Sequence, residues 1–248
     1  MKLQKLRPAI FYRRTAEIMK RALIIMAKVP VIGTVKTRLQ PFLSPDECAE
    51  LAAAFLRDAE NKAKIVCENT ILAYSPADER EVLENILQFK NTLVEQTGAD
   101  LGARMANAFE FALAREKDSA VVMIGTDSPT FPAEFMKLAF KFLEKDADAV
   151  LGKSADGGFY LIGLRRFAPP LFENIEWSVP TVFEQMTANL SRFKFDNLRL
   201  VPDWYDVDTP DDLNRLRDEI LNDVKAQKRA AQTYRWILSN SEIFRRRF

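Results

Sequence analysis

A short apolar run, residues 22–26, leads into a loop with three cationic side chains, Lys28, Lys36 and Arg38. Gly33 lies between them. Lysine offers a point charge and arginine a two-pronged donor to phosphate oxygens, while glycine can adopt positive φ and let backbone N–H groups approach an anion. The spacing predicts a phosphate-binding loop after a first strand. Taken alone, these residues also fit a solvated basic loop between a strand and a helix.

A second apolar run, residues 120–125, ends in Thr126, Asp127 and Ser128 ahead of Pro129. In an open α/β sheet, ligands bind beyond the carboxyl ends of the strands, so Asp127 is expected at the mouth of a crevice. Mg²⁺ is usually held by one or two carboxylates together with phosphates and water. Asp127 is therefore a predicted metal ligand. The alternative is a turn or helix cap before the proline.

Two more carboxylates, Asp206 and Asp208, flank Val207. In an extended segment, residues on either side of one position point the same way, so Asp208 could share a metal with Asp127. The residues that follow predict a helix start, with Thr209 as the N-cap and Asp211 and Asp212 in the first turn. A helix start does not account for Asp206 and Asp208.

Two segments with paired glycines complete the set of polar motifs. Residues 98–105 precede a helical pattern and could present backbone N–H groups and Arg104 to a base or phosphate. Residues 154–160 contain Asp156 before two glycines and resemble an Asp-Gly-Gly hairpin turn. Neither motif is specific in isolation.

The amino-acid composition excludes several kinds of catalytic site. The chain of 248 residues has no histidine, which excludes Ser-His-Asp and Cys-His triads and His-containing zinc sites. Any catalysis must use carboxylates, cations and a hard metal. Each end of the chain, 1–21 and 225–248, holds seven Lys or Arg against one acidic residue, while the 22 basic and 33 acidic residues between them give a net charge of −11.

The strands and helices that the sequence predicts must position these groups. Short β-rich runs alternate with helical patterns, which predicts a mostly parallel sheet between helices, an α/β class. Expected strands cover 22–26, 70–73, 92–95, 121–125, 149–152 and 159–164. One helix is expected from about 45 to 64, and others are expected to begin at Ser75-Pro76 and at Thr209-Pro210. Residues 211–240 are expected to form one or two helices. An apolar stripe at helical spacing begins at Met105.

The length fits one large domain, expected over residues 19–224. A basic N-terminal extension, 1–18, precedes the second methionine, and a basic helical tail, 225–248, contains three consecutive arginines just before Phe248. We expect a cytoplasmic protein, because the chain has neither an apolar run of 18 residues nor a signal-like N-terminus. Cys48 and Cys67 are expected to be reduced.

Taken in order, six segments resemble the rSAM/selenodomain-associated transferase 1 family. They are K-V-P-V-I-G-T-V-K-T-R-L (28–39), G-A-D-L-G-A-R-M (98–105), I-G-T-D-S-P (124–129), L-G-K-S-A-D-G-G-F-Y-L-I-G-L (151–164), W-S-V-P-T (177–181) and D-V-D-T-P-D-D-L (206–213). The family belongs to the nucleotide-diphospho-sugar transferase superfamily and resembles phospholactate and molybdenum-cofactor guanylyltransferases. The resemblance implies a GT-A-like, Rossmann-type three-layer αβα sandwich with a mostly parallel mixed sheet.

The resemblance also implies roles for residues. Phosphates would contact Lys28, Lys36 and Arg38 around Gly33, and Asp127 and Asp208 would hold Mg²⁺ or Mn²⁺. The base or ribose would lie near Asp100, Gly102 and Arg104, and the acceptor near Asp156. The chain departs from the usual pattern in its basic ends and in Gly98-Ala99, which replaces a more common Gly-Gly.

The expected activity is metal-dependent transfer from a nucleotide sugar or a nucleoside triphosphate to a small-molecule acceptor. The family label favours glycosyl transfer, whereas the cationic loop suits nucleotidyl transfer with a pyrophosphate leaving group. In both, Lys36, Arg38 and Asp127 would act on the phosphates, with Asp156 as general base if the acceptor is a hydroxyl. The alternative is a non-catalytic nucleotide-binding or scaffold protein. Nucleic-acid binding is not expected, and the sequence does not indicate an oligomeric state.

Overall fold

The computed structural model describes residues 19–115 and 119–246. The predicted extension, 1–18, and the last two residues of the predicted tail lie outside the described residues. Seven described strands form one sheet in the order β3-β2-β1-β4-β6-β5-β7. They are β1 (Lys20–Lys28), β2 (Thr70–Ser75), β3 (Thr92–Glu95), β4 (Ser119–Ile124), β5 (Ala149–Ser154), β6 (Phe159–Leu164) and β7 (Leu198–Trp204).

The sheet is mixed but mostly parallel. Strand β6 runs antiparallel to both of its neighbours, β4 and β5, and every other neighbouring pair is parallel. Strands β1 and β4 are direct neighbours, with Ile25 beside Ile124. Because parallel neighbours end at the same edge, the loops after β1 and β4 emerge side by side.

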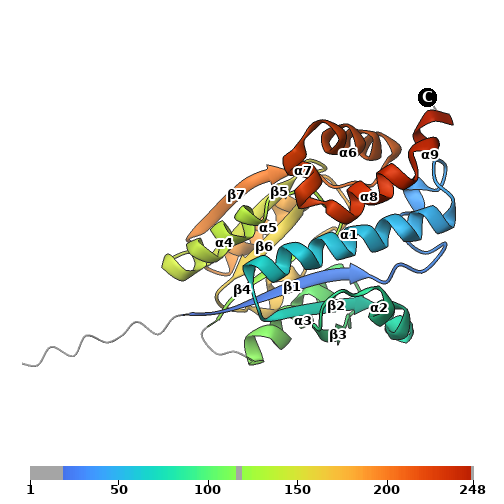
Figure 1. Cartoon of the computed structure of the whole chain (residues 1–248). Coiled ribbons are helices and arrows are strands. Elements are labelled where there is room, and N and C mark those ends of the chain that lie inside the picture. Colours follow the sequence, from blue (N-terminus) through green and yellow to red (C-terminus); the bar gives the residue numbers. More distant parts are fainter. Residues whose placement is uncertain (1–18, 116–118, 247–248) are drawn as a thin grey trace, which may run out of the picture.

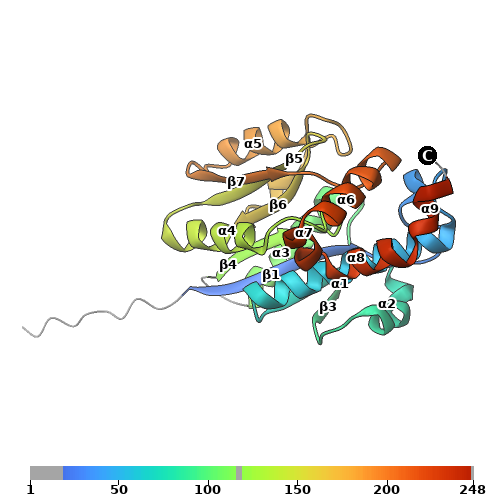
Figure 2. The same ribbon diagram turned by 45° about the horizontal axis from the view of Figure 1, so that its top comes forward.

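Helices cover both faces of the sheet (Figures 1 and 2). They are α1 (Pro45–Val66), α2 (Arg80–Ile86), α3 (Leu101–Arg115), α4 (Ala133–Lys145), α5 (Val182–Arg192), α6 (Pro210–Asn222), α7 (Val224–Arg229), α8 (Ala231–Ser239) and α9 (Ser241–Arg246), with 3₁₀ turns η1 (Thr37–Leu39), η2 (Ala77–Glu79) and η3 (Pro169–Phe172). Within the described part of the chain, no helix is long and apolar enough to cross a membrane.

Alternating side chains of the strands divide the core in two. In β1, Leu23 and Ile25 pack into the cluster formed with α1 and α4, whereas Ala22 and Ile24 face the cluster formed with α3 and α5. The predicted three-layer αβα sandwich is confirmed, since each face of the sheet buries its own layer of helices.

Most predicted elements are present. All six expected strands occur, and α1 begins with the predicted capping box between Ser44 and Glu47. The segment after Ser75-Pro76 forms η2 before α2 begins, and residues 155–158 form the hairpin turn between β5 and β6. Strand β7 is missed, because this edge strand is largely exposed and contains Pro202. Helices α4 and α5 were not predicted either.

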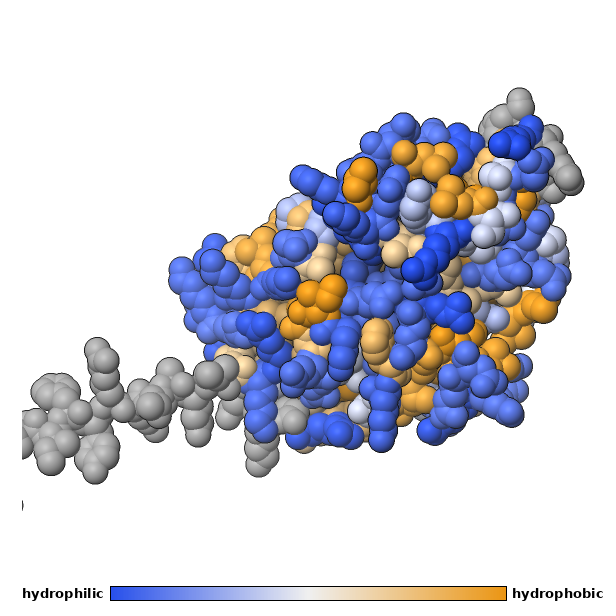
Figure 3. Space-filling view, in the orientation of Figure 1, coloured by the Kyte–Doolittle hydropathy of each residue, from blue (hydrophilic) through white to orange (hydrophobic). Residues whose placement is uncertain are grey.

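The C-terminal helices pack against α1 (Figures 1 and 2). Residues 211–240, expected as one or two helices, contain three, and a fourth follows them. Ile220 of α6, Ala226 of α7 and Trp236 of α8 share a buried cluster with Leu51 and Phe55 of α1. The face seen in Figure 1 is mostly hydrophilic, with apolar side chains exposed over these helices (Figure 3).

Asp58 of α1 is the polar link to the C-terminal helices. Its carboxylate is 1% exposed and accepts hydrogen bonds from Gln232 N at 2.9 Å, Thr233 N at 2.9 Å and Thr233 Oγ1 at 2.7 Å. Burial raises the pKa of Asp58, and these hydrogen bonds oppose the rise. Asp58 therefore stabilises the N-terminal turn of α8 against α1.

Lys62, one turn further along α1, reaches the loop after β4. Its Nζ donates hydrogen bonds to Pro129 O at 2.7 Å and Ser128 O at 3.3 Å, and it lies 4.0 Å from the centre of the Phe131 ring. These contacts fix the backbone that follows Asp127. Burial lowers the pKa of Lys62 to about 7, opposed by Asp58 and Glu219 and reinforced by Arg229.

Replacing Asp58 by alanine should lower the free energy of unfolding by about 3 kcal/mol, because buried donors of Gln232 and Thr233 lose their acceptor. Urea unfolding monitored by circular dichroism measures the change. Asp78→Ala, at an exposed position, is the control and should change stability by less than about 0.5 kcal/mol. Equal stabilities of the two variants would contradict the role of Asp58.

Lys62 should also leave a signature in the pH dependence of stability. Between pH 7 and 9 the unfolded chain keeps a proton that the folded chain has lost, so stability rises with pH. Relative to Lys62→Met, the wild type should gain about 2 kcal/mol over this interval, because the full slope of 1.36 kcal/mol per pH unit is reached only above the folded pKa of about 7. Urea unfolding at both pH values tests this, with exposed Lys64→Met as the matched control. Parallel pH curves for Lys62→Met and the wild type would show that Lys62 is charged throughout.

Candidate active site

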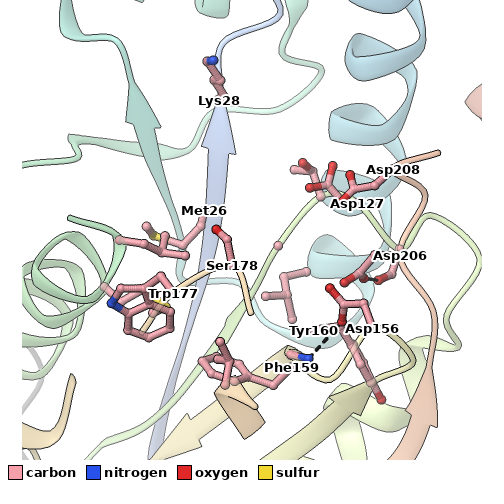
Figure 4. Close-up of a pocket in the computed structure, with 18 of the residues that line it drawn as sticks. Met26, Lys28, Asp127, Asp156, Phe159, Tyr160, Trp177, Ser178, Asp206 and Asp208 are labelled. Atoms are coloured by element: carbon pink, nitrogen blue, oxygen red, sulfur yellow. Dashed lines mark hydrogen bonds between the residues drawn. The ribbon is translucent and has the colours of Figure 1, made fainter. Parts of the chain in front are cut away.

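A cleft of about 710 Å³ opens at the carboxyl ends of β1 and β4. It brings together the loop after β1, the turn after β4, the hairpin turn before β6 and the segment after β7. Its polar lining includes the cations Lys28, Lys36 and Arg38 and the carboxylates Asp127, Asp156, Asp206 and Asp208. Figure 4 shows the four carboxylates on one side of the cleft and Met26, Phe159 and Trp177 on the other.

Lys36 lies at the centre of the polar half. Its Nζ is 2.5 Å from Asp127 Oδ1 and 3.2 Å from Asp208 Oδ1, and it donates a hydrogen bond to Val207 O at 2.8 Å. The Lys36 side chain is 7% exposed, whereas those of Asp127 and Asp208 are 49% and 39% exposed. Burial alone would lower the pKa of Lys36, but the two aspartates raise it, and the net shift is upward. Lys36 is therefore a buried cation held by two carboxylates.

Local backbone structure positions these side chains. Lys36 has φ of 48°, in the left-handed region, at the start of η1. Val207 N donates to Asp127 O at 2.9 Å, which joins the segment after β7 to the turn after β4. Thr209 and Asp212 then form a capping box that starts α6 directly after Asp208. Asp127 and Asp208 are therefore held beside each other by backbone contacts as well as by Lys36.

The donor set formed by Asp127 and Asp208 fits a hard cation. Each directs an oxygen at one positively charged atom, Lys36 Nζ, so the space between them already accommodates a cation. Among the described residues, no group of three or more His, Cys, Asp or Glu side chains forms a metal cluster. Two carboxylates are sufficient for Mg²⁺ when phosphates and water supply the other ligands.

Asp206 is a site residue to which the sequence assigned no role. Its carboxylate is half-buried and accepts hydrogen bonds from Ser128 Oγ and, at 2.7 Å, from Ser154 Oγ. Burial raises its pKa to about 6; the two serines oppose this rise, and Asp127 and Asp156 add to it. Through these hydrogen bonds, Asp206 links the segment after β7 to the end of β5 and to the turn after β4. The Asp-Val-Asp spacing suggested its direction, but its serine partners are distant in sequence.

The other cations of the loop differ in their contacts. Arg38 lies at the cleft with Nη1 3.7 Å from Asp208 Oδ2. Lys28 also lines the cleft, and its Nζ donates to Thr34 O at 2.6 Å, which closes the loop on itself. Gly33 adopts positive φ, 79°, at the turn of this loop, but it does not line the cleft.

Asp100, Gly102 and Arg104 lie beside the cleft and not in its lining. Asp100 Oδ1 accepts a hydrogen bond from Ala103 N at 2.8 Å, so it caps α3. Arg104 Nε donates to Gly98 O at 3.4 Å. The structure gives these residues local structural contacts, and their predicted role at a base or ribose stays a prediction.

Asp156 lines the cleft beside Tyr160, as Figure 4 shows. Its Oδ1 accepts a hydrogen bond from Gly158 N at 2.9 Å within the hairpin turn. The structure therefore brings Lys28, Lys36, Arg38, Asp127, Asp156 and Asp208 into one cleft, and leaves Gly33, Asp100, Gly102 and Arg104 at its border.

Several known proteins resemble this chain. A 2-phospho-L-lactate guanylyltransferase from Methanocaldococcus sp. (strain FS406-22) is 27% identical over 195 residues, which cover 77% of this chain and 80% of the relative. A crystal structure from Desulfovibrio desulfuricans G20, provisionally described as a nucleotide-diphospho-sugar transferase, is 31% identical with a TM-score of 0.83, covering 92% of this chain and 98% of that one. These relatives support the expected class, a nucleotide-dependent transferase.

A more distant structure shows the same fold. The 4-diphosphocytidyl-2C-methyl-D-erythritol synthase from Anaerococcus prevotii DSM 20548 is 14% identical with a TM-score of 0.53, covering 79% of this chain and 94% of that one. The profile of the DUF2064 family, described as uncharacterized proteins conserved in bacteria, matches residues 56–179, which include Asp127 and Asp156. With half of its length matched, the chain belongs to the DUF2064 family.

Proposed function

We propose that this protein is a metal-dependent nucleotidyltransferase that moves a nucleotidyl group from a nucleoside triphosphate to a small acceptor. The observation that carries the proposal is the placement of Lys36 Nζ between Asp127 and Asp208 at the mouth of the cleft. The 2-phospho-L-lactate guanylyltransferase similarity supports this reaction type. Within the family, the finer rSAM-associated transferase 1 assignment is part of the same proposal.

The charges of the cleft suit this reaction. An acceptor oxygen forms a new bond to the α-phosphorus, the bond from that phosphorus to the bridging oxygen of the β-phosphate breaks, and pyrophosphate leaves with the negative charge. Lys28 and Arg38 line the cleft and can neutralise that charge. Lys36 can join them once a metal ion takes the place of its ammonium group between Asp127 and Asp208. A bound Mg²⁺ or Mn²⁺ would polarise the phosphate oxygens as a Lewis acid. Asp127 and Asp208 are the residues that would hold it.

The acceptor approaches from the side of Asp156. A phosphate or carboxylate acceptor attacks through an oxygen that is already anionic and needs no general base. For a hydroxyl acceptor, Asp156 is the proposed base, with its second carboxylate oxygen available because Oδ1 accepts from Gly158 N. The protein's main contribution is to position the two reacting oxygens and to stabilise charge.

Glycosyl transfer from a nucleotide sugar is the second candidate. The 31% identity with the Desulfovibrio desulfuricans G20 protein favours it. In that reaction a diphosphate leaves a sugar carbon, so fewer phosphate contacts are needed than in nucleotidyl transfer.

Thermal unfolding with Mg²⁺ and a panel of nucleoside triphosphates and nucleotide sugars distinguishes the candidates. A ligand that binds only the folded protein stabilises it by RT ln(1 + [L]/Kd), about 2.7 kcal/mol at 100 times Kd. One triphosphate should raise the melting temperature most, and removal of Mg²⁺ by EDTA should reduce the shift. Stronger stabilisation by a nucleotide sugar would favour glycosyl transfer, and no shift with any ligand would favour a non-catalytic scaffold.

Substitution of the two proposed ligands tests the metal. Asp127→Asn and Asp208→Asn should each lower the rate of pyrophosphate release by on the order of 10²-fold or more, because each removes a main electrostatic contact to the cation. Asp211→Asn, in the exposed first turn of α6, is the matched control and should keep the wild-type rate. Wild-type turnover by Asp127→Asn at saturating Mg²⁺ would remove the basis for metal binding at this position.

A further inference from the structure

The cleft has an apolar half that the proposed phosphate chemistry does not use. It is formed by one side chain each from β1, α3 and β4, two from β6 and one from the segment between η3 and α5; we call this set the apolar wall: Met26, Met105, Met123, Phe159, Ile162 and Trp177. Met105, Met123 and Ile162 are buried, whereas Met26, Phe159 and Trp177 remain partly exposed. Figure 4 shows these last three facing the cleft opposite the carboxylates.

Trp177 is held in place by close packing. A Cβ at Gly102 would lie 2.8 Å from Trp177 Cζ2 and 2.9 Å from Nε1, so the ring rests directly on the backbone of α3. The Phe159 ring meets it nearly edge to face, with centroids 6.4 Å apart and an interplanar angle of 71°. These contacts hold the Trp177 ring in one orientation, so it presents a rigid apolar surface to the cleft.

The segment that carries Trp177 is joined to the turn that carries Asp156. Gly157 has φ of 92°, and a Cβ there would lie 1.9 Å from Pro180 O, so only glycine allows this approach. Phe183 N also donates to Gly157 O at 2.9 Å. The apolar wall and Asp156 consequently keep a fixed distance from each other.

Strand order shows which part of a substrate would meet the wall. The proposed phosphate contacts come from the ends of β1 and β4, and β6, which carries Phe159, is the next strand beyond β4. Asp156 precedes β6 in the hairpin turn. The Phe159 and Trp177 end of the wall therefore lies on the acceptor side of the cleft.

The low polarity of the apolar wall limits which chemical classes of acceptor can bind there. Of its six side chains, only that of Trp177 carries a polar hydrogen. Ser178, whose φ is 66°, lines the cleft next to it and is exposed. A sugar hydroxyl placed against the wall would meet no strong hydrogen-bond acceptor among these six side chains, whereas an apolar ring or chain would bury its surface against them.

We propose that the Phe159 and Trp177 end of the apolar wall is the acceptor subsite, and that the acceptor is a small molecule with an apolar aromatic or aliphatic body attached to its attacking phosphate or hydroxyl. This inference rests on the proposed function, because it uses the phosphate positions assigned there. It deepens that function by naming the chemical class of the acceptor. It also predicts that polyhydroxylated acceptors are poor substrates.

Isothermal titration of the full chain with three probes tests the subsite: phenyl phosphate, methyl phosphate and glucose 1-phosphate. Each is titrated with and without saturating GTP and Mg²⁺, or the triphosphate that stabilises the protein most. In the wild type, phenyl phosphate should bind about tenfold more tightly than the other two, since only its ring can contact the wall, and GTP should not compete with it.

Substitutions of Trp177 test whether the preference for phenyl phosphate arises from the apolar wall. Trp177→Ala should abolish the preference for phenyl phosphate and leave GTP affinity within about threefold of the wild type. Trp177→Phe keeps an apolar ring and should retain most of the preference, which covers the case in which the alanine variant fails to fold. Trp236→Phe, in the buried cluster with α1, is the matched control and should bind all ligands like the wild type.

Two results would overturn the inference. If Trp177→Ala weakens GTP binding and spares phenyl phosphate, the wall holds the nucleobase. If glucose 1-phosphate binds as tightly as phenyl phosphate, the acceptor is polar. Failure of the wild type to bind any triphosphate, with the phenyl phosphate preference intact and lost in Trp177→Ala, would refute nucleotidyl transfer and support the apolar subsite.

Discussion

Burial of the Lys36 ammonium between Asp127 and Asp208 is the interaction on which the site depends. An unpaired charge at a position with 7% exposure would be strongly unfavourable, so both carboxylates must lie next to it. This requirement brings together three segments that are far apart in sequence. Lys36 adopts a left-handed backbone conformation, with φ of 48°, at this position.

The order of the strands makes this meeting possible. Strands β1 and β4 are parallel neighbours, so the loops that carry Lys36 and Asp127 leave the sheet side by side. Strand β7 is parallel to β5, and β5 ends where the turn to β6 begins, so Asp208 and Asp156 reach the same edge of the sheet. The order of the strands thus places all four aspartates of the cleft at one edge of the sheet. Asp206 stabilises this arrangement by accepting hydrogen bonds from Ser128 and Ser154.

Much of the fold could be predicted from local patterns. The capping box of α1 and the apolar runs of β1 and β4 each specify an element through short-range chemistry. Strand β7 could not be found in this way, because Arg199, Pro202 and Asp203 give it a weak strand pattern and its pairing with β5 is a tertiary contact. The same limit applies to the site: Asp127 and Asp208 were predicted from position and spacing, whereas the buried setting of Lys36 and the serine partners of Asp206 depend on packing across the whole sheet.

We propose that one cleft holds the phosphates in its charged half, around Asp127 and Asp208, and the acceptor against its apolar half. The most direct test of this central claim is a crystal structure with a nucleoside triphosphate and Mn²⁺, because the anomalous signal of manganese locates the ion without assumptions. We predict a manganese peak within bonding distance of both Asp127 and Asp208 and of a triphosphate oxygen, with Lys36 or Arg38 on the phosphates. A bound triphosphate with no manganese at these two aspartates would contradict the account.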